Sequence, residues 1–220
     1  MAINTVIFDM DGLLIDSEPL WKEAADEIFI HYQIQLTEAQ YHTTTGLRTK
    51  EFVAAWFSKF KIPDTEITVA EKKIVEKVAA KITEKGNPMP GVGYIFDFFQ
   101  SRQFKIGLAS SSPQFIIDQV IQQLNISSFL TATASAENLP YGKPHPEVYL
   151  NCAAALKSQP TECICFEDSF NGMIAARAAR MKCVVIPVYY QQKEERWNAA
   201  DLKLSSLQNF AALHLNALNQ

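Results

Sequence analysis

Short apolar runs rich in β-branched or aromatic residues recur along the chain, and helical patterns separate most of them. Such runs are typical of buried strands. They are Thr5–Phe8, Lys105–Ala109, Leu130–Ala134, Cys163–Phe166, Cys183–Ile186 and a short edge strand at Asp201–Leu204. Helices are expected between them at Phe115–Leu124, Glu147–Leu156 and Gly172–Ala179. The alternation predicts an α/β fold with a Rossmann-like, doubly wound parallel sheet.

One long segment breaks this alternation. From about Leu20 to Thr83 the sequence has amphipathic helical periodicity and no convincing strand. Helices are expected at Leu20–Tyr32, Lys50–Phe60 and Val69–Lys81. A hinge-like linker, Gly86–Gly91, follows them. We therefore expect a core domain made of residues 1–16 and 88–220, and an α-helical cap domain, 17–87, inserted into it.

The composition narrows the possible partners and compartment. The chain has 220 residues, of which 48% are hydrophobic and 20% charged, as in soluble globular proteins. Its formal charge of -4, with scattered Lys and Arg, gives no electrostatic case for binding nucleic acid or an anionic membrane. No apolar stretch approaches the roughly 20 residues of a membrane helix, and no signal peptide is evident. We expect a cytoplasmic monomer.

Polar side chains follow the carboxyl ends of several predicted strands. They are Asp9 and Asp11 after the first strand, Ser110 and Ser111 after the second, Lys143 in the loop after the third, and Glu167 and Asp168 after the fourth. In a doubly wound sheet the carboxyl ends of the strands meet at one edge, where ligands bind. These residues are therefore expected to lie close together.

This set of residues suits phosphoryl transfer. Four carboxylates would repel one another unless a divalent cation lay among them, and hard oxygen ligands favour Mg²⁺. Lys143 and the two serines add donors for a phosphoryl group. Asp9 is ionised near neutral pH and can attack phosphorus without a base. Asp11 could protonate the departing alkoxide and later take a proton from water, giving a two-step reaction through an aspartyl-phosphate.

Each residue also has a plainer interpretation. Asp9 to Gly12 could form only a turn, and Ser110 to Ser112 could form only a helix N-cap. Lys143 could be a solvated loop residue, and the Glu167-Asp168 pair could cap the following helix. Their joint occurrence at successive strand ends favours the catalytic interpretation.

The same residues resemble the motifs of the haloacid dehalogenase superfamily. The resembling stretches are Phe8-Asp9-Met10-Asp11-Gly12, Ser110, Gly142-Lys143-Pro144 and Glu167-Asp168-Ser169, in the order of the family's four motifs. The resemblance implies that Asp9 is the nucleophile, Asp11 the acid/base, and Ser110, Ser111 and Lys143 the phosphate-binding residues. It also implies metal ligation by Asp9, the backbone carbonyl of Asp11, and Asp168, with Glu167 as a ligand or just outside the ligand set.

A helical cap between the first two motifs resembles the branch that includes β-phosphoglucomutase. Stretches such as Leu13–Trp21 and Asn171–Ala176 are similar to the bacterial hexitol phosphatase / 2-deoxyglucose-6-phosphate phosphatase group. This implies a Mg²⁺-dependent hydrolase of carbohydrate metabolism, acting on small sugar or sugar-alcohol phosphates. Glu18 and Arg48 lie where cap residues of the family approach the substrate, although both could be surface charges.

Two other functions stay open at this point. A sugar-phosphate mutase would retain the phosphoryl group. In that family a His of the first cap helix helps to suppress hydrolysis, and Trp21 takes its place here. A receiver-like phospho-acceptor domain would also carry clustered Asp residues and a Lys, but it lacks a helical insertion.

Overall fold

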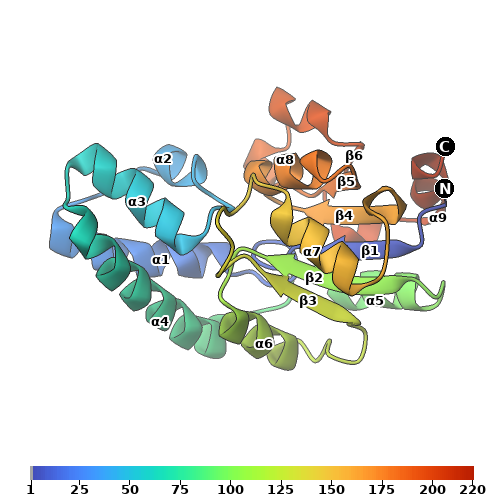
Figure 1. The fold of residues 1–220 in the computed structure, drawn as a ribbon, viewed down its shortest axis with the longest axis horizontal. Coiled ribbons are helices and arrows are strands. Elements are labelled where there is room, and N and C mark those ends of the chain that lie inside the picture. Colours follow the sequence, from blue (N-terminus) through green and yellow to red (C-terminus); the bar gives the residue numbers. More distant parts are fainter. Residues whose placement is uncertain (1) are drawn as a thin grey trace.

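A six-stranded parallel sheet forms the centre of the protein in a computed structural model, which describes residues 2–220. The strands are β1 (Thr5–Phe8), β2 (Lys105–Ser110), β3 (Ala132–Ser135), β4 (Cys163–Glu167), β5 (Lys182–Val185) and β6 (Leu202–Lys203). Their order across the sheet is β3-β2-β1-β4-β5-β6 (Figure 1). The predicted α/β, doubly wound fold is confirmed.

Strand β1 lies between β2 and β4, at the point where the strand order reverses. All four of its residues are buried, as expected for a strand covered on both faces. Phe8 lies opposite Leu108 of β2 and Phe166 of β4. The residues that follow these three positions therefore emerge side by side at the carboxyl edge, where doubly wound sheets bind ligands.

Helices cover both faces of the sheet. One face carries α5 (Val92–Gln100), α6 (Gln114–Gln123) and α9 (Ala212–Leu218), and the other carries α7 (Glu147–Ala155) and α8 (Phe170–Ala178). On the first face the rings of Phe8 and Phe96 lie 5.0 Å apart, and those of Phe99 and Phe166 lie 5.8 Å apart. Aromatic burial on this scale is a main source of core stability.

The helix α5 was not expected from the sequence. Its residues Val92–Gln100 are rich in Phe and Tyr and include Gly93, which are poor helix formers. Ile95, Phe96 and Phe99 are fully buried against the sheet, so tertiary packing outweighs the weak intrinsic preference. The weakly patterned strand β3 also starts two residues later than predicted, at Ala132.

Between β1 and α5 the chain forms helices and no further strand, apart from isolated bridges of Ile15 with Asp11 and Pro88. The helices are α1 (Glu18–Phe29), α2 (Glu38–His42), α3 (Thr49–Phe60) and α4 (Ile67–Lys85), with 3₁₀ turns at Ile30–Tyr32 and Asp64–Glu66. We call residues 18–85 the helical insertion. Phe29 stacks on Phe52 at 5.3 Å and lies 5.7 Å from Phe57, which gives the insertion apolar packing of its own. In Figure 1 the insertion occupies the side of the molecule opposite the two termini.

The two segments that connect the insertion to the sheet lie next to each other. Asp16 N donates to Asn87 O at 2.9 Å, and Met89 N donates to Leu14 O at 2.9 Å. The remaining short 3₁₀ helices lie in the second half of the chain, at Pro160–Glu162, Tyr189–Gln191, Glu195–Ala199 and Leu207–Asn209. Within residues 2–220, none of the helices combines the length and the apolar character needed to cross a membrane.

Candidate active site

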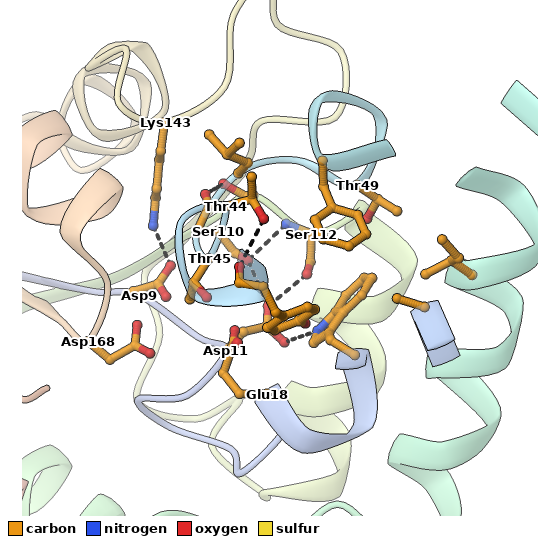
Figure 2. Close-up of a pocket in the computed structure, with 18 residues that line it drawn as sticks. Asp9, Asp11, Glu18, Thr44, Thr45, Thr49, Ser110, Ser112, Lys143 and Asp168 are labelled. Atoms are coloured by element: carbon orange, nitrogen blue, oxygen red, sulfur yellow. Dashed lines mark hydrogen bonds and ion pairs between the residues drawn. The ribbon is translucent and has the colours of Figure 1, made fainter. Parts of the chain in front are cut away.

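A pocket lies between the carboxyl edge of the sheet and the helical insertion (Figure 2). Its core wall consists of Asp9, Asp11, Ser110, Ser111, Ser112, Lys143 and Asp168. Its insertion wall consists of Glu18, Trp21, Ala25, Tyr41, Thr44, Thr45, Gly46, Leu47, Thr49, Phe52 and Ile74. The sheet and the insertion therefore each contribute one side of the same cavity.

The residue after β1 begins the core wall. Asp9 N donates to Phe166 O at 3.0 Å, which continues the pairing of β1 with β4 and fixes where the Asp9 side chain emerges. Three residues later Gly12 has φ +74, and a Cβ at this position would lie 2.2 Å from Asp168 Oδ2. A glycine is therefore required here for the turn after β1 to approach Asp168.

Lys143 reaches two carboxylates from the loop after β3. Its ammonium is buried, donates to Asp9 Oδ1 and donates to Glu167 Oε1 at 2.6 Å. Burial would lower the pKa of Lys143, but the charges of Asp9 and Glu167 outweigh burial and raise it, so the lysine stays charged. Figure 2 shows Lys143 pointing toward Asp9, with Asp168 beside them.

Glu167 is held on both oxygens. Oε1 accepts from Lys143 and from the Tyr149 hydroxyl, and Oε2 accepts from Ser169 N at 3.2 Å and Ser169 Oγ at 3.0 Å. A Cβ on Gly172 would lie 1.8 Å from Glu167 Oε1, so α8 can cover this carboxylate only because that residue is glycine. Tyr149 and Ser169 were not predicted to contribute, because a hydroxyl within a helix or at a helix start has no distinctive sequence signal.

The buried acids form a cluster that suits a divalent cation. Oxygens of Asp9, Glu167 and Asp168 lie within 4.8 Å of one another. Burial and the charge of Glu167 raise the pKa of Asp9 to about 8, although Lys143 opposes this, and burial and Asp9 raise the pKa of Asp168 well above its usual range. The expectation that Asp9 is ionised near neutral pH without help is therefore wrong for the cation-free site, and a bound cation is needed to favour the carboxylate. Three carboxylates and one ammonium leave a net charge of -2 when all are ionised, which one divalent cation would balance. The oxygen-only ligands fit Mg²⁺.

The Asp11 carboxylate is surrounded by donors. Oδ1 accepts from Ser17 Oγ at 2.6 Å and Trp21 Nε1 at 2.8 Å. Oδ2 accepts from Ser112 Oγ at 2.7 Å and Ser110 Oγ at 3.4 Å. The donors come from both the core and the insertion, so this carboxylate links the two walls. The sequence indicates Trp21 only as the residue that stands in place of a mutase's His, and it indicates no catalytic role for Ser17 or Ser112.

The two predicted phosphate-binding serines lie in different settings. Ser110 Oγ accepts from Ser112 N at 3.0 Å within the turn after β2. Ser111 Oγ donates to Gly46 O of the insertion at 2.8 Å, so its hydroxyl joins the two walls. Both residues line the pocket.

The two predicted substrate contacts from the insertion lie in different places. Glu18 lines the pocket near Asp11, and burial followed by the charges of Asp11 and Asp9 raises its pKa to about 8. Arg48 is not among the residues that line the pocket. Its guanidinium donates instead to Glu51 and to backbone carbonyls of the core loop between β3 and Lys143.

The insertion wall is mostly apolar. Ala25, Phe52 and Ile74 present hydrocarbon, and Thr45 and Thr49 add hydroxyls. The Thr44 hydroxyl is engaged, since it donates to Tyr41 O at 2.9 Å and accepts from Trp56 Nε1 at 3.1 Å. Among the pocket-lining residues of the described chain, Lys143 on the core wall is the one basic side chain.

The sequence matches a known family over most of its length. The profile of the haloacid dehalogenase-like hydrolases matches residues 6–186, which run from within β1 to the end of β5 and include the whole insertion. The chain belongs to the haloacid dehalogenase-like hydrolases. The resemblance predicted from the motifs is thereby confirmed.

Two relatives within this family extend the similarity. Hexitol phosphatase B from Escherichia coli K12 is 37% identical over 214 residues, covering 97% of this chain and 96% of that protein. A phosphorylated carbohydrates phosphatase from Thermotoga maritima is 30% identical over 177 residues, covering 80% of this chain and 82% of that protein. The first match spans both the core and the insertion.

Solved structures of haloacid dehalogenase-like proteins share the fold. A β-phosphoglucomutase from Clostridium difficile superposes with a TM-score of 0.88 at 24% identity, covering 99% of this chain and 97% of that chain. At this identity the likeness establishes the fold, including the helical insertion, and leaves the reaction to be argued from the site.

Proposed function

We propose that the protein is a Mg²⁺-dependent phosphatase that hydrolyses small sugar or sugar-alcohol monophosphates. The observation that carries this proposal is the convergence of Asp9, Lys143 and Asp168 at the carboxyl edge of the sheet, beneath a pocket closed by the helical insertion. The similarity to hexitol phosphatase B over nearly the whole of both chains supports the substrate class. Hexitol phosphates and 2-deoxyglucose-6-phosphate are the candidate substrates.

Asp9, Asp168 and the backbone carbonyl of Asp11 would hold the Mg²⁺ ion. The bound ion would supply charge neutralisation between the carboxylates and the phosphate. Both oxygens of Glu167 accept hydrogen bonds from protein donors, which favours a role in orienting Lys143 rather than direct ligation. Lys143 and Ser110 would bind phosphate oxygens.

The chain's own residues then account for both steps. Asp9 attacks phosphorus and forms an aspartyl-phosphate, while Asp11 gives a proton to the departing alkoxide. Asp11 next accepts a proton from the water that attacks the aspartyl-phosphate, which releases phosphate and restores Asp9. Ser17, Ser112 and Trp21 orient the Asp11 carboxylate during these proton transfers.

Residues 17–87 would act as a cap domain over a core made of residues 1–16 and 88–220. The two connecting segments, at Asp16 and Asn87, are hydrogen-bonded to each other and suit a hinge. They can bend together while the core and the cap each keep their own packing. A closed cap would exclude bulk water and place the sugar or polyol against the insertion wall.

A sugar-phosphate mutase is the second candidate, and one feature of the pocket disfavours it. Trp21 contacts Asp11 with an indole N–H, which donates but does not titrate, so it cannot replace a histidine in controlling proton transfer. The family match and the helical insertion likewise disfavour a receiver-like phospho-acceptor.

A direct assay tests the proposal. The purified protein would be incubated with Mg²⁺ and a panel of hexitol and hexose monophosphates, while free phosphate and isomerised sugar phosphate are both measured. Phosphate release without isomer is the expected result. Isomer without phosphate would establish the mutase, and stable labelling of Asp9 by acetyl phosphate with no turnover would establish a phospho-acceptor.

A further inference from the structure

Arg48, at the N-terminal end of α3, reaches across to the core. Its Nη1 donates to Leu139 O at 2.6 Å and Ala136 O at 3.2 Å, and its Nη2 donates to Pro140 O at 3.3 Å. Nη2 also donates to Glu51 Oε1 at 2.6 Å. Four of the five guanidinium N–H groups are therefore directed at protein acceptors.

Glu51, one helical turn after Arg48, completes the contact. Its Oε1 also accepts from Gly142 N at 2.9 Å, so one carboxylate oxygen binds a side chain of the insertion and a backbone N–H of the core. Burial would raise the pKa of Glu51, but hydrogen bonds from Arg48 and Gly142 outweigh burial and lower it. The side chains of Arg48 and Glu51 are 12% and 30% exposed, so water competes only partly for these hydrogen bonds.

Gly142 fits this contact closely. A Cβ at this position would lie 2.4 Å from Glu51 Oε2 and 2.8 Å from Arg48 Nε. On this backbone, any other residue would require the Glu51 and Arg48 side chains to shift away from the loop. We call Arg48, Glu51 and residues 136–142 the clasp.

The clasp ends next to a residue of the core wall. Gly142 immediately precedes Lys143, whose ammonium contacts Asp9 and Glu167. A shift of the Gly142 backbone would move Lys143 with it, and displacement by about 1 Å is enough to impair a catalytic group.

We propose that Arg48 and Glu51 are positioning residues that hold loop 136–142, and through it Lys143, in place over Asp9. This inference rests on the proposed phosphatase function, in which Lys143 binds the phosphate. It differs from the sequence-based expectation for Arg48, which placed the guanidinium on the substrate. The insertion thus contributes to phosphate binding without contacting the phosphate.

Inorganic phosphate distinguishes positioning of Lys143 from direct contact with the sugar, because it fills the phosphate site and has no sugar. We would measure its Kd by calorimetry in the presence of Mg²⁺, together with kcat/KM for a hexitol phosphate, in Arg48→Ala, Glu51→Ala and Glu51→Gln proteins. Lys50→Ala is the matched control, since Lys50 is exposed on the same helix. Thermal melts would establish that every variant is folded.

Positioning of Lys143 predicts that Arg48→Ala and Glu51→Ala weaken phosphate binding about tenfold and lower kcat/KM by a similar factor. Glu51→Gln keeps an acceptor for Gly142 N and should stay within about twofold of the unmodified protein. A loss of kcat/KM with unchanged phosphate binding would overturn the inference in favour of a substrate contact. Unchanged values for both would overturn it as well. Failure of the unmodified protein to bind phosphate with Mg²⁺ would instead contradict the proposed function.

Gly142→Ala approaches the same contact from the core. We expect it to weaken phosphate binding in the otherwise unmodified protein and to add little in an Arg48→Ala/Glu51→Ala background, where the obstructing side chains are gone. Fully additive effects would contradict the clasp, because residues that act through one contact are not additive.

Discussion

The two walls of the pocket differ in almost every physical respect. On the core wall, Asp9, Lys143 and Asp168 are buried charged groups whose pKa values burial and neighbouring charges displace. The insertion wall, apart from Glu18 at its base, presents hydrocarbon and neutral hydroxyls. Concentrated charge in a buried site is suited to bond making and breaking, whereas a neutral surface is suited to selecting the rest of a molecule.

This difference separates chemistry from recognition. The core wall is built on strand ends, whose positions the sheet fixes, and its charges are held by partners such as Tyr149 and Ser169. The insertion wall is built on α1 to α4 and their loops, which can vary in sequence without disturbing the sheet. Substitutions on the core wall should therefore change the rate for every substrate. Those on the insertion wall should change selectivity, except at Glu18 and Trp21, which lie against Asp11.

The largest expected effect is loss of the nucleophile. Asp9→Asn should lower kcat by at least about 10³-fold on every phosphate ester, because an amide cannot form the aspartyl-phosphate. Rates of phosphate release across the substrate panel would test this. Asp97→Asn, on an exposed position of α5, is the matched control. An active Asp9→Asn protein would remove the reason for assigning chemistry to the core wall.

Removal of the metal should have the next largest effect, and it should depend on pH. Without a cation the folded protein holds a proton on Asp9 up to a pKa of about 8, well above the ordinary value of 3.8. The folded state then binds more protons than the unfolded state, so the stability of the metal-free protein should fall as pH rises from about 4 to about 8. Mg²⁺ competes with the proton on Asp9, so the affinity of the protein for Mg²⁺ should rise as pH rises over the same range.

Thermal melts with EDTA or with Mg²⁺, from about pH 5 to about pH 8.5, would test this expectation, because that range covers most of the predicted change in stability. The stabilisation by Mg²⁺ should grow as pH rises, and EDTA should abolish turnover. A magnesium-induced shift in Tm that is the same at both ends of the range would mean that protons do not compete for the site. That result would contradict the charge assigned to the core wall.

Trp21 tests a hydrogen bond that the insertion donates to an acid of the core. Trp21→Phe removes the indole N–H that binds Asp11 Oδ1 and keeps most of the apolar bulk. We expect kcat to fall roughly threefold to tenfold, because Asp11 keeps its other donors. Trp197→Phe removes a comparable buried indole bond, to Gln191 O, from a residue that does not line the pocket, and should leave kcat unchanged.

The sequence alone could predict the residues at the ends of the strands, but not those whose role depends on the direction of a side chain. Asp9, Lys143 and Asp168 could be placed together because β-branched runs define the strands and the topology of a parallel sheet brings their ends to one edge. Tyr149, Ser112 and Ser17 could not, because their roles depend on side-chain directions that no sequence period encodes. Which way Arg48 points was equally undetermined, since the N-terminal end of α3 lies between the pocket and loop 136–142.

The smallest expected effect lies inside the insertion, away from its wall. Glu27 of α1 accepts from Lys77 at 2.5 Å and Lys81 at 2.7 Å on α4, and these hydrogen bonds lower its pKa to about 2. Glu27→Gln should lower the free energy of unfolding by about 0.5 kcal/mol, because exposed ion pairs are screened by water. It should leave kcat unchanged, since the pair supports the helices and touches no reacting group.

The direction in which the stability difference changes with pH shows whether the lost ion pair of Glu27 causes the destabilisation. A lowered pKa gives stability that is present above the ordinary value of 4.5 and is lost as pH falls toward about 2. The difference in Tm between Glu27→Gln and the unmodified protein should therefore be largest at neutral pH and should shrink between about pH 4.5 and about pH 3. High salt at neutral pH should reduce this difference to roughly the same extent, because it screens the ion pair. A difference that persists in acid would indicate lost packing instead. A fall in kcat would show that the shape of the insertion wall depends on this pair, and would weaken the separation of the two walls.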